Sequence, residues 1–333
     1  MSIQFRVLGA PFLDNALYME VHPGQQVYRL LFDCGAGCLD DIKPSKIMAV
    51  DHLCFSHFHL DHIAGFDRFL RFNYRRENKP VRVWGPESAV EIIGHRLQGV
   101  TWDRVENEPG EWLVTSLGKA DKETVKFVTR EQFRLPHPVE KSSFTGTLFS
   151  NGNIEVRAVR LQHRTPSMAY IVKEQPQVNI DREELATLKI PPGPWLNRLK
   201  DFDTFGDSDT LEIGGSRYAV QNLREKLLVQ TPGESLAYVT DCLFEPSGTE
   251  ALVREIRGVT TLVCEATYAD EDIELARENY HLTASQAAQI AANANAEQLI
   301  LLHISDRYQS QGIAHILNQA REVFPETYLP DTW

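Results

Sequence analysis

Apolar stretches of two kinds recur along the chain, and several of them end at a histidine or an aspartate. Residues 154–161 alternate apolar and polar side chains, which is typical of a half-buried strand, whereas residues 236–240 and 298–302 are almost continuously apolar, as in buried strands. An apolar run within residues 47–55 comes directly before a strongly polar cluster, and residues 62–70 favour a helix after it. The pattern predicts a strand-to-helix loop at the cluster, where α/β proteins usually carry their chemistry.

This cluster packs three imidazoles and one carboxylate into residues 57–62, with the sequence H-F-H-L-D-H. His57 and His59 are two positions apart, so in extended backbone their side chains point the same way and can hold one ion. Asp61 and His62 follow where the chain must turn, and they can reach a second ion. Imidazole and carboxylate both suit zinc, whereas the other interpretation, a histidine-rich surface loop, gives no packing reason for such density. The cluster therefore predicts a metal site.

The pattern H-x-H-x-D-H is identified as the signature of the metallo-β-lactamase superfamily. This resemblance implies further ligands downstream at strand ends, in the order histidine, aspartate, histidine. His163, Asp241 and His303 follow three predicted strands in this order. Each alone is as easily explained by a capped loop, but in this order after the signature they are predicted to be ligands.

The C-terminal third resembles the tRNase Z (ribonuclease Z, tRNA 3′-endonuclease) branch of that superfamily. Residues 262–268 are similar to its H-E-[AS]-T-[FY] strand, residues 279–291 to its H-S-T helix entry, and residues 299–308 to its H-x-S-x-R-Y end. The chain departs from the branch at Cys264, where a histidine is usual, and at Leu282, where a serine is usual. Neither departure removes a predicted metal ligand.

The resemblance implies an α/β fold, a metallo-β-lactamase αββα four-layer sandwich with a protruding arm insertion, as a single domain over residues 1–333. Its halves are expected at about 1–172 and 215–333, and the arm at about 174–214. A chain of 333 residues, 42% hydrophobic, is long enough to bury such a core. No apolar run approaches the ~18 residues of a membrane span. Five cysteines without an exporting signal predict reduced thiols in a cytoplasmic protein.

The arm segment has few periodic apolar positions and an unexpected charge. Members of the branch use the arm to clamp the tRNA elbow, yet acidic side chains outnumber basic ones here, and the net charge of the chain is −12. An element that grips RNA is expected to be basic, because phosphate contacts dominate affinity. A basic stretch beside the metal site is either an additional RNA contact or the solvated face of a helix. Its members are Arg68, Arg71, Arg75, Arg76 and Lys79.

The resemblance and the ligand types together imply a two-metal site. The expected ligands of one ion are His57, His59 and His163. Those of the other are Asp61, His62 and His303, and Asp241 is expected to bridge both. Two ions ~3.5–4 Å apart hold a shared water, lower its pKa toward neutrality and clamp a phosphodiester for in-line attack. Zinc is favoured because the ligands mix nitrogen and oxygen without thiolate; manganese or iron is the alternative.

The catalytic roles follow from family position. His281 comes directly before a capping-box pattern and is expected to face the site as the general acid for the leaving alkoxide. Glu265 would orient and charge it, and Asp61 would also orient the attacking water. Ser305 and Arg307 are predicted to bind phosphate oxygens, and a structural salt bridge is the alternative for Arg307.

Together these features predict a metal-dependent hydrolase. The first interpretation is a dizinc phosphodiesterase, an endoribonuclease that removes the 3′ trailer of tRNA precursors. The second is a hydrolase of the same fold that acts on small phosphodiesters, cyclic nucleotides or other esters, since fold and metal site do not fix the substrate. The third is an RNA-binding or scaffold protein without catalysis. The resemblance further implies a homodimer in which the arm of one subunit serves the site of the other.

Overall fold

A computed structural model describes residues 2–24 and 26–333 of the chain. The chain forms two compact units. One contains the residues up to Glu174 together with Glu234–Trp333, and the other is Gln175–Gly233. Among the described residues, every helix is too short or too polar to cross a membrane. The cysteines at positions 34, 38, 54, 242 and 264 are buried free thiols.

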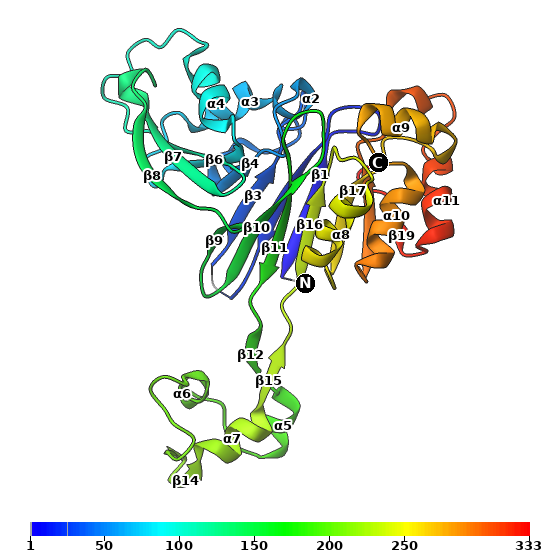
Figure 1. Ribbon diagram of the computed structural model, residues 1–333. Coiled ribbons are helices and arrows are strands. Elements are labelled where there is room, and N and C mark those ends of the chain that lie inside the picture. The colour runs from blue at the N-terminus through cyan, green and yellow to red at the C-terminus, as the bar shows by residue number, and fades with distance from the viewer. Residues whose placement is uncertain (1, 25) are drawn as a thin grey trace. The chain divides into compact units, whose positions relative to one another are not determined.

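The first unit contains two large sheets (Figure 1). The first sheet has eight strands that neighbour one another in chain order. They are β1 (Ile3–Leu8), β2 (Ala16–Val21), β3 (Tyr28–Phe32), β4 (His52–Cys54), β5 (Val81–Pro86), β6 (Glu111–Leu117), β7 (Asp121–Val128) and β8 (His137–Ser143). Strands β3 to β6 pair in parallel, and the other neighbours pair antiparallel.

The second sheet has the strand order β19-β18-β17-β16-β11-β10-β9. Its strands are β9 (Thr147–Ser150), β10 (Ile154–Leu161), β11 (Ser167–Glu174), β16 (Ser235–Val239), β17 (Thr261–Glu265), β18 (Gln298–Leu302) and β19 (Thr327–Tyr328). Strands β16 to β19 pair in parallel and the others antiparallel. The predicted alternating strand is β10, and the two predicted apolar strands are β16 and β18, so these predictions are confirmed.

Helices cover the outer faces of both sheets (Figure 1). The helices beside the first sheet are α1 (Pro44–Ala49), α2 (Leu60–Ile63), α3 (Phe66–Asn73) and α4 (Ala89–Gln98). Those beside the second sheet are α8 (Pro246–Glu255), α9 (Ile273–Asn279), α10 (Ala284–Asn293) and α11 (Ala314–Val323).

Three apolar cores separate these layers. Between the sheets, Phe32 packs against Tyr170 and Tyr238, with ring centroids 5.5 and 5.6 Å apart. Outside the first sheet, α3 packs its phenylalanines edge-on against the buried Trp112 of β6. The third core joins the second sheet to α8, α10 and α11. The order helix, sheet, sheet, helix confirms the predicted αββα sandwich.

The parallel strands of both sheets bring chemistry-bearing residues to one edge. Strands β16, β17 and β18 are covered on both faces, which explains their continuous apolar sequence. The pairing of these strands places their carboxyl ends next to one another, so Asp241, Glu265 and His303 lie at neighbouring strand ends. In the first sheet, β4 ends at Cys54, directly before the loop with the histidine cluster. This edge, where parallel strands end, is the usual place for a site in an α/β protein.

The second unit, Gln175–Gly233, has an apolar core of its own that includes Trp195, Leu199 and Leu223. Its elements are β12 (Gln177–Ile180), α5 (Arg182–Thr187), α6 (Trp195–Lys200), β13 (Thr210–Ile213), β14 (Ser216–Ala219), α7 (Val220–Leu227) and β15 (Leu228–Thr231). The insertion expected from the sequence ended at about 214, whereas the unit runs to Gly233. The difference arises because α7 packs into this core and β15 pairs with β12.

Candidate metal centre

The histidine cluster lies on a strand-to-helix loop, as the hydrophobic pattern predicts. His57 is in the loop after β4, and Asp61 and His62 are in the first turn of α2. His57 and His62 are buried, whereas Asp61 is half-buried and His59 is exposed. The cluster therefore extends from the interior to the surface, so a substrate can reach it.

Three residues at this edge hold a left-handed backbone conformation. They are Asp33 with φ 58°, Asp241 with φ 49° and His303 with φ 55°. This conformation is uncommon for residues other than glycine, and it persists only where the surroundings impose it. Both aspartates contact His62, and Asp241 also contacts His303. The strained backbone thus serves to direct these three side chains into one polar cluster.

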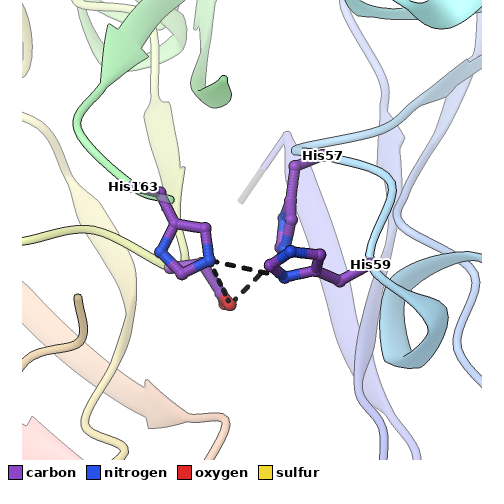
Figure 2. Close-up of side chains that lie close together, drawn as sticks. His57, His59 and His163 are labelled. Atoms are coloured by element: carbon purple, nitrogen blue, oxygen red, sulfur yellow. Dashed lines mark hydrogen bonds and ion pairs between the residues drawn. The ribbon is translucent and has the colours of Figure 1, made fainter. Parts of the chain in front are cut away.

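The rings of His57, His59 and His163 lie close together (Figure 2), and an oxygen of Asp241 lies near them. The Nε2 atoms of His57 and His163 lie 3.5 and 3.7 Å from Oδ2 of Asp241. Nε2 of His163 is also 3.4 Å from Nδ1 of His59. These atoms can meet one cation, and they are the three histidines that the sequence assigned to a first ion.

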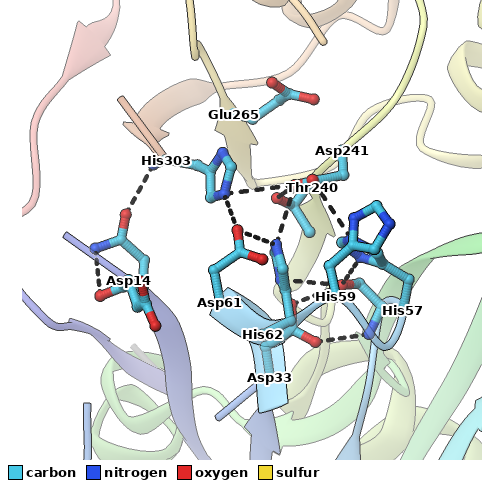
Figure 3. A network of polar contacts seen from close by, with 12 residues as sticks. Asp14, Asp33, His57, His59, Asp61, His62, Thr240, Asp241, Glu265 and His303 are labelled. Atoms are coloured by element: carbon cyan, nitrogen blue, oxygen red, sulfur yellow. Dashed lines mark hydrogen bonds and ion pairs between the residues drawn. The ribbon is translucent and has the colours of Figure 1, made fainter. Parts of the chain in front are cut away.

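His62 and His303 face the other oxygen of Asp241, and Asp61 lies against both imidazoles (Figure 3). Nε2 of His62 lies 3.3 Å from Oδ1 of Asp241 and 3.3 Å from Oδ2 of Asp61. Nε2 of His303 lies 3.7 Å from the same Oδ1 and 3.3 Å from Asp61. One carboxylate thus faces two groups of donors, which is the arrangement that a bridging ligand needs.

The chemistry of these donors fits a divalent cation. The buried Nε2 atoms of His57 and His62 have no hydrogen-bond partner among the described residues, which is costly unless another group meets them. Burial and the neighbouring His62 lower the pKa of His57 to about 2, so its imidazole is neutral, the form that binds metals. Burial alone would raise the pKa of Asp241, but His303 and His62 hold it well below its usual range. Imidazoles around an ionised carboxylate form a donor set for zinc-like ions.

Asp33 supports His62 from the other side of its ring and was not predicted to belong to the site. Its Oδ2 accepts hydrogen bonds from Nδ1 of His62 and from the hydroxyl of Tyr238, both at 2.9 Å. With Nδ1 donating, Nε2 of His62 can bind a cation. Burial lowers the pKa of His62, but Asp241 and Asp33 raise it well above its usual value, so the carboxylates draw a positive charge to this imidazole. A signal was available, because Asp33 directly follows an apolar strand, as Asp241 nearly does.

The structure brings His281 and Glu265 together beside the cluster. Nδ1 of His281 lies 3.0 Å from Oε2 of Glu265, and its Nε2 lies 3.9 Å from Oδ2 of Asp241. Thr283 begins α10 in the predicted capping box with Gln286, which fixes the backbone directly after His281. Burial lowers the pKa of His281, but Glu265 raises it to about 9. The imidazole is therefore held by a carboxylate on one side and faces the cluster on the other.

Ser305 and Arg307 are placed differently from one another. Ser305 helps to line a cavity of about 280 Å³ that also contains Asp61 and His303. The guanidinium of Arg307 instead lies 3.3 Å from Asp272. This ion pair is the structural alternative that the sequence left open for Arg307.

Comparison with known proteins identifies relatives over nearly the whole chain. Residues 225–304 match the family model of the beta-lactamase superfamily domain. Ribonuclease Z from Deinococcus radiodurans is 39% identical over 98% of this chain and 97% of its own length. Ribonuclease Z from Prochlorococcus marinus strain NATL1A is 32% identical over 96% of this chain and 93% of its own length.

Solved structures share the fold at low sequence identity. The short form of human tRNase Z superposes with a TM-score of 0.54 at 18% identity, covering 99% of this chain and 96% of its own. The metallo-beta-lactamase fold protein YhfI from Bacillus subtilis gives 0.56 at 14%, covering 98% and 95%. These likenesses show the fold, and the near-complete match to a ribonuclease Z at 39% identity shows the family. The chain belongs to the ribonuclease Z family.

Proposed function

We propose that this chain is a metal-dependent endoribonuclease that removes the 3′ trailer of tRNA precursors. The observation that carries the proposal is the Asp241 carboxylate between two groups of histidines, in a chain 39% identical to a ribonuclease Z. A phosphodiester is a substrate to which two adjacent cations are suited, because the attacking and the leaving oxygen both carry negative charge.

We propose that this centre would hold two zinc ions. His57, His59 and His163 would hold the first, and Asp61, His62 and His303 the second. When bound, such ions supply Lewis acidity, which lowers the pKa of a shared water and neutralises the phosphodiester. Manganese or iron is the alternative, because mixed nitrogen and oxygen donors accept each of them.

Side chains of this protein would orient the attacking water and supply the proton that the leaving oxygen needs. The half-buried Asp61 can accept a hydrogen bond from the attacking water and orient it. As water adds to phosphorus, it would give a proton to the carboxylate of Asp61, the bond to the leaving oxygen would break, and His281 would give that oxygen a proton from Nε2. Glu265, on Nδ1, would stabilise the positive imidazole before the transfer. Ser305, which lines the same cavity as Asp61 and His303, would donate to a phosphate oxygen.

The test of this function is cleavage of a tRNA precursor that carries a 3′ trailer, next to turnover of bis(p-nitrophenyl) phosphate. We expect metal-loaded protein to cut the precursor once, near the discriminator base, and to hydrolyse the small diester. A chelator should abolish both reactions. Turnover of the small diester without cleavage of the precursor would contradict the tRNA assignment and favour a hydrolase of small phosphodiesters.

The basic stretch beside the metal centre is mostly engaged within the protein. Arg76 donates to the backbone carbonyls of Val50 and Pro80 at 2.6 and 2.8 Å. Lys79 forms an ion pair with Asp51. These contacts favour a structural role over RNA binding for much of the stretch.

We propose instead that the second unit, Gln175–Gly233, is the arm that contacts tRNA. A cavity of about 810 Å³ in this unit is lined by Arg182, Lys200, Asn179 and Asn197 together with apolar side chains, and no acidic residue is among its described lining. Cationic and amide donors are the groups that meet phosphate oxygens. Although the arm is acidic as a whole, the lining of this cavity is suited to a phosphate backbone.

Arg224 offers a way to test the arm without changing the metal centre. Its nearly buried guanidinium donates to the carbonyls of Leu199, Asp201 and Phe205 at 2.8–3.0 Å. Arg224→Ala is expected to destabilise the arm by about 2–4 kcal/mol, because the buried carbonyl of Leu199 left without a donor costs about 1–3 kcal/mol and the half-buried carbonyls of Asp201 and Phe205 cost less. Limited proteolysis should then cut the arm, and precursor cleavage should fall while diester turnover stays.

Arg198→Ala is the matched control for this variant. Arg198 is an exposed arginine of α6 whose guanidinium lies against the ring of Phe205. We expect this variant to resist proteolysis like the parent protein. Equal loss of both activities in Arg224→Ala would contradict a role of the arm in substrate contact.

The homodimer and the cytoplasmic location that the sequence implies stay predictions.

A further inference from the structure

Thr267 lies two residues after the end of β17, between Glu265, the partner of the proposed general acid, and His303, a proposed metal ligand. Its side chain is buried, with 6% of the residue exposed. Its Oγ1 is 2.6 Å from Oε2 of Glu265 and 3.0 Å from Nδ1 of His303. It therefore touches both the partner of the proposed general acid and a proposed metal ligand.

Glu265 can only accept hydrogen bonds in this environment. It is fully buried, and its Oε1 accepts from the backbone N–H of Cys242 at 2.8 Å. Its Oε2 accepts from the backbone N–H of Leu282 at 3.2 Å and faces Nδ1 of His281 at 3.0 Å. Two backbone N–H groups and an imidazole nitrogen thus meet its two oxygens, which is the surrounding of an ionised carboxylate.

The direction of the two shorter hydrogen bonds of Thr267 follows from this; its Oγ1 also lies 3.4 Å from Nδ1 of His281, which is nearer to Glu265 at 3.0 Å. A hydroxyl has one proton to donate, and the ionised Glu265 has none, so the Thr267 O–H donates to Glu265. The Oγ1 of Thr267 can then only accept from His303, so Nδ1 of His303 carries the proton. In a neutral imidazole this leaves the lone pair on Nε2, and Nε2 is the atom that faces Asp61 and Asp241.

We propose that Thr267 is a positioning residue that fixes His303 in its Nδ1–H tautomer and ties it, through Glu265, to His281. One buried carboxylate then sets the orientation of the proposed acid and of one proposed ligand. This inference rests on the proposed function for its catalytic meaning, but its metal-binding part can be tested without any RNA.

The test compares Thr267→Val, which keeps the shape and removes the hydroxyl, with Thr267→Ser, which keeps the hydroxyl. Zinc affinity of each metal-free variant is measured by competition with a chromophoric chelator. We expect Thr267→Val to bind its second equivalent of zinc about 10- to 100-fold more weakly, the usual cost of losing a hydrogen-bond partner behind a ligand. Thr267→Ser should stay close to the parent protein.

Thr129→Val controls for the loss of any buried threonine hydroxyl. Thr129 is fully buried and donates to the carbonyl of Tyr74 at 2.6 Å, beside the first sheet. We expect its zinc affinity to equal that of the parent protein. Parental zinc affinity in Thr267→Val would overturn the proposal, and so would equal losses in the valine and serine variants, which would assign the effect to packing.

A second measurement needs no variant and holds if Thr267→Val fails to fold. The imidazole nitrogens of the zinc-loaded parent protein are observed by ¹⁵N NMR. We expect a protected proton on Nδ1 of His303 and zinc on Nε2. A proton on Nε2 would overturn the proposal. Neither measurement uses tRNA, so failure of precursor cleavage by the parent protein would count against the proposed function and not against the role of Thr267.

Discussion

Asp241→Asn is expected to abolish metal-dependent hydrolysis while the protein stays folded. The carboxylate lies within 3.9 Å of five histidines and faces both groups of donors, so its charge serves the whole centre. An amide keeps the size of the side chain but supplies no negative charge to a cation. Losing the ions removes several kcal/mol of transition-state stabilisation, which corresponds to a fall of about 10³-fold or more in kcat/KM.

Asparagine is also the appropriate replacement for the backbone. Asp241 has a φ of 49°, and asparagine tolerates the left-handed conformation better than most residues. The melting temperature of metal-free protein should therefore change little. Zinc content by atomic emission and turnover of bis(p-nitrophenyl) phosphate are the measurements.

Asp51→Asn supplies the control, because Asp51 accepts from the backbone N–H of Arg29 and pairs with Lys79, away from the centre. It should retain the parental zinc content. Full zinc content and activity in Asp241→Asn would contradict the bridging role and the ligand scheme built on it.

The candidate ligands could be named from the sequence because the contiguous cluster marks a metal site and the family signature says where further ligands follow. The H-x-H-x-D-H run is contiguous, so its density alone indicated a metal. Asp241 and His303 stand just past continuous apolar strands, and parallel strands end at one edge of a sheet. Local sequence therefore predicted the strands and the edge at which the candidate ligands gather, and the resemblance selected the residues among them.

The position of Asp33 after an apolar strand was visible in the sequence, but contacts that form only through the packing of the two sheets were not predictable. Asp33 is held by Tyr238, which lies 205 positions away on the other sheet. The hydroxyl of Thr267 had no visible role in the sequence, because its role depends on the buried carboxylate of Glu265 and on the ring of His303. Such contacts arise from the tertiary fold, and no spacing along the chain encodes them.

The placement of Arg307 and the end of the arm were also set by tertiary contacts. The guanidinium of Arg307 pairs with Asp272, which belongs to a different loop. The helix α7 follows a segment without clear periodicity and looked like the return to the main domain, yet its apolar side chains complete the core of the second unit. Sequence pattern identifies a helix, but the core that receives it depends on the fold.

His281→Ala is expected to separate the two substrates of this centre. The leaving group of RNA is an alkoxide, which needs a proton, so loss of a positioned general acid should lower precursor cleavage by about 10²- to 10⁴-fold. The p-nitrophenolate of bis(p-nitrophenyl) phosphate leaves without a proton, so its turnover should change far less. His137→Ala is the matched control, because His137 also pairs with a glutamate, Glu131 at 2.6 Å, but in the first sheet away from the centre.

Zinc content decides what a different result would mean. Asp241, His281 and His303 also lie close enough to hold a cation among themselves. If His281 were a ligand, its loss would lower zinc content and both activities together, because both reactions would lack the same ion. If it is the acid, zinc content stays at the parental level and only the reaction with the poor leaving group suffers. Unchanged cleavage of both substrates would exclude either role, and the proton would then have to come from water.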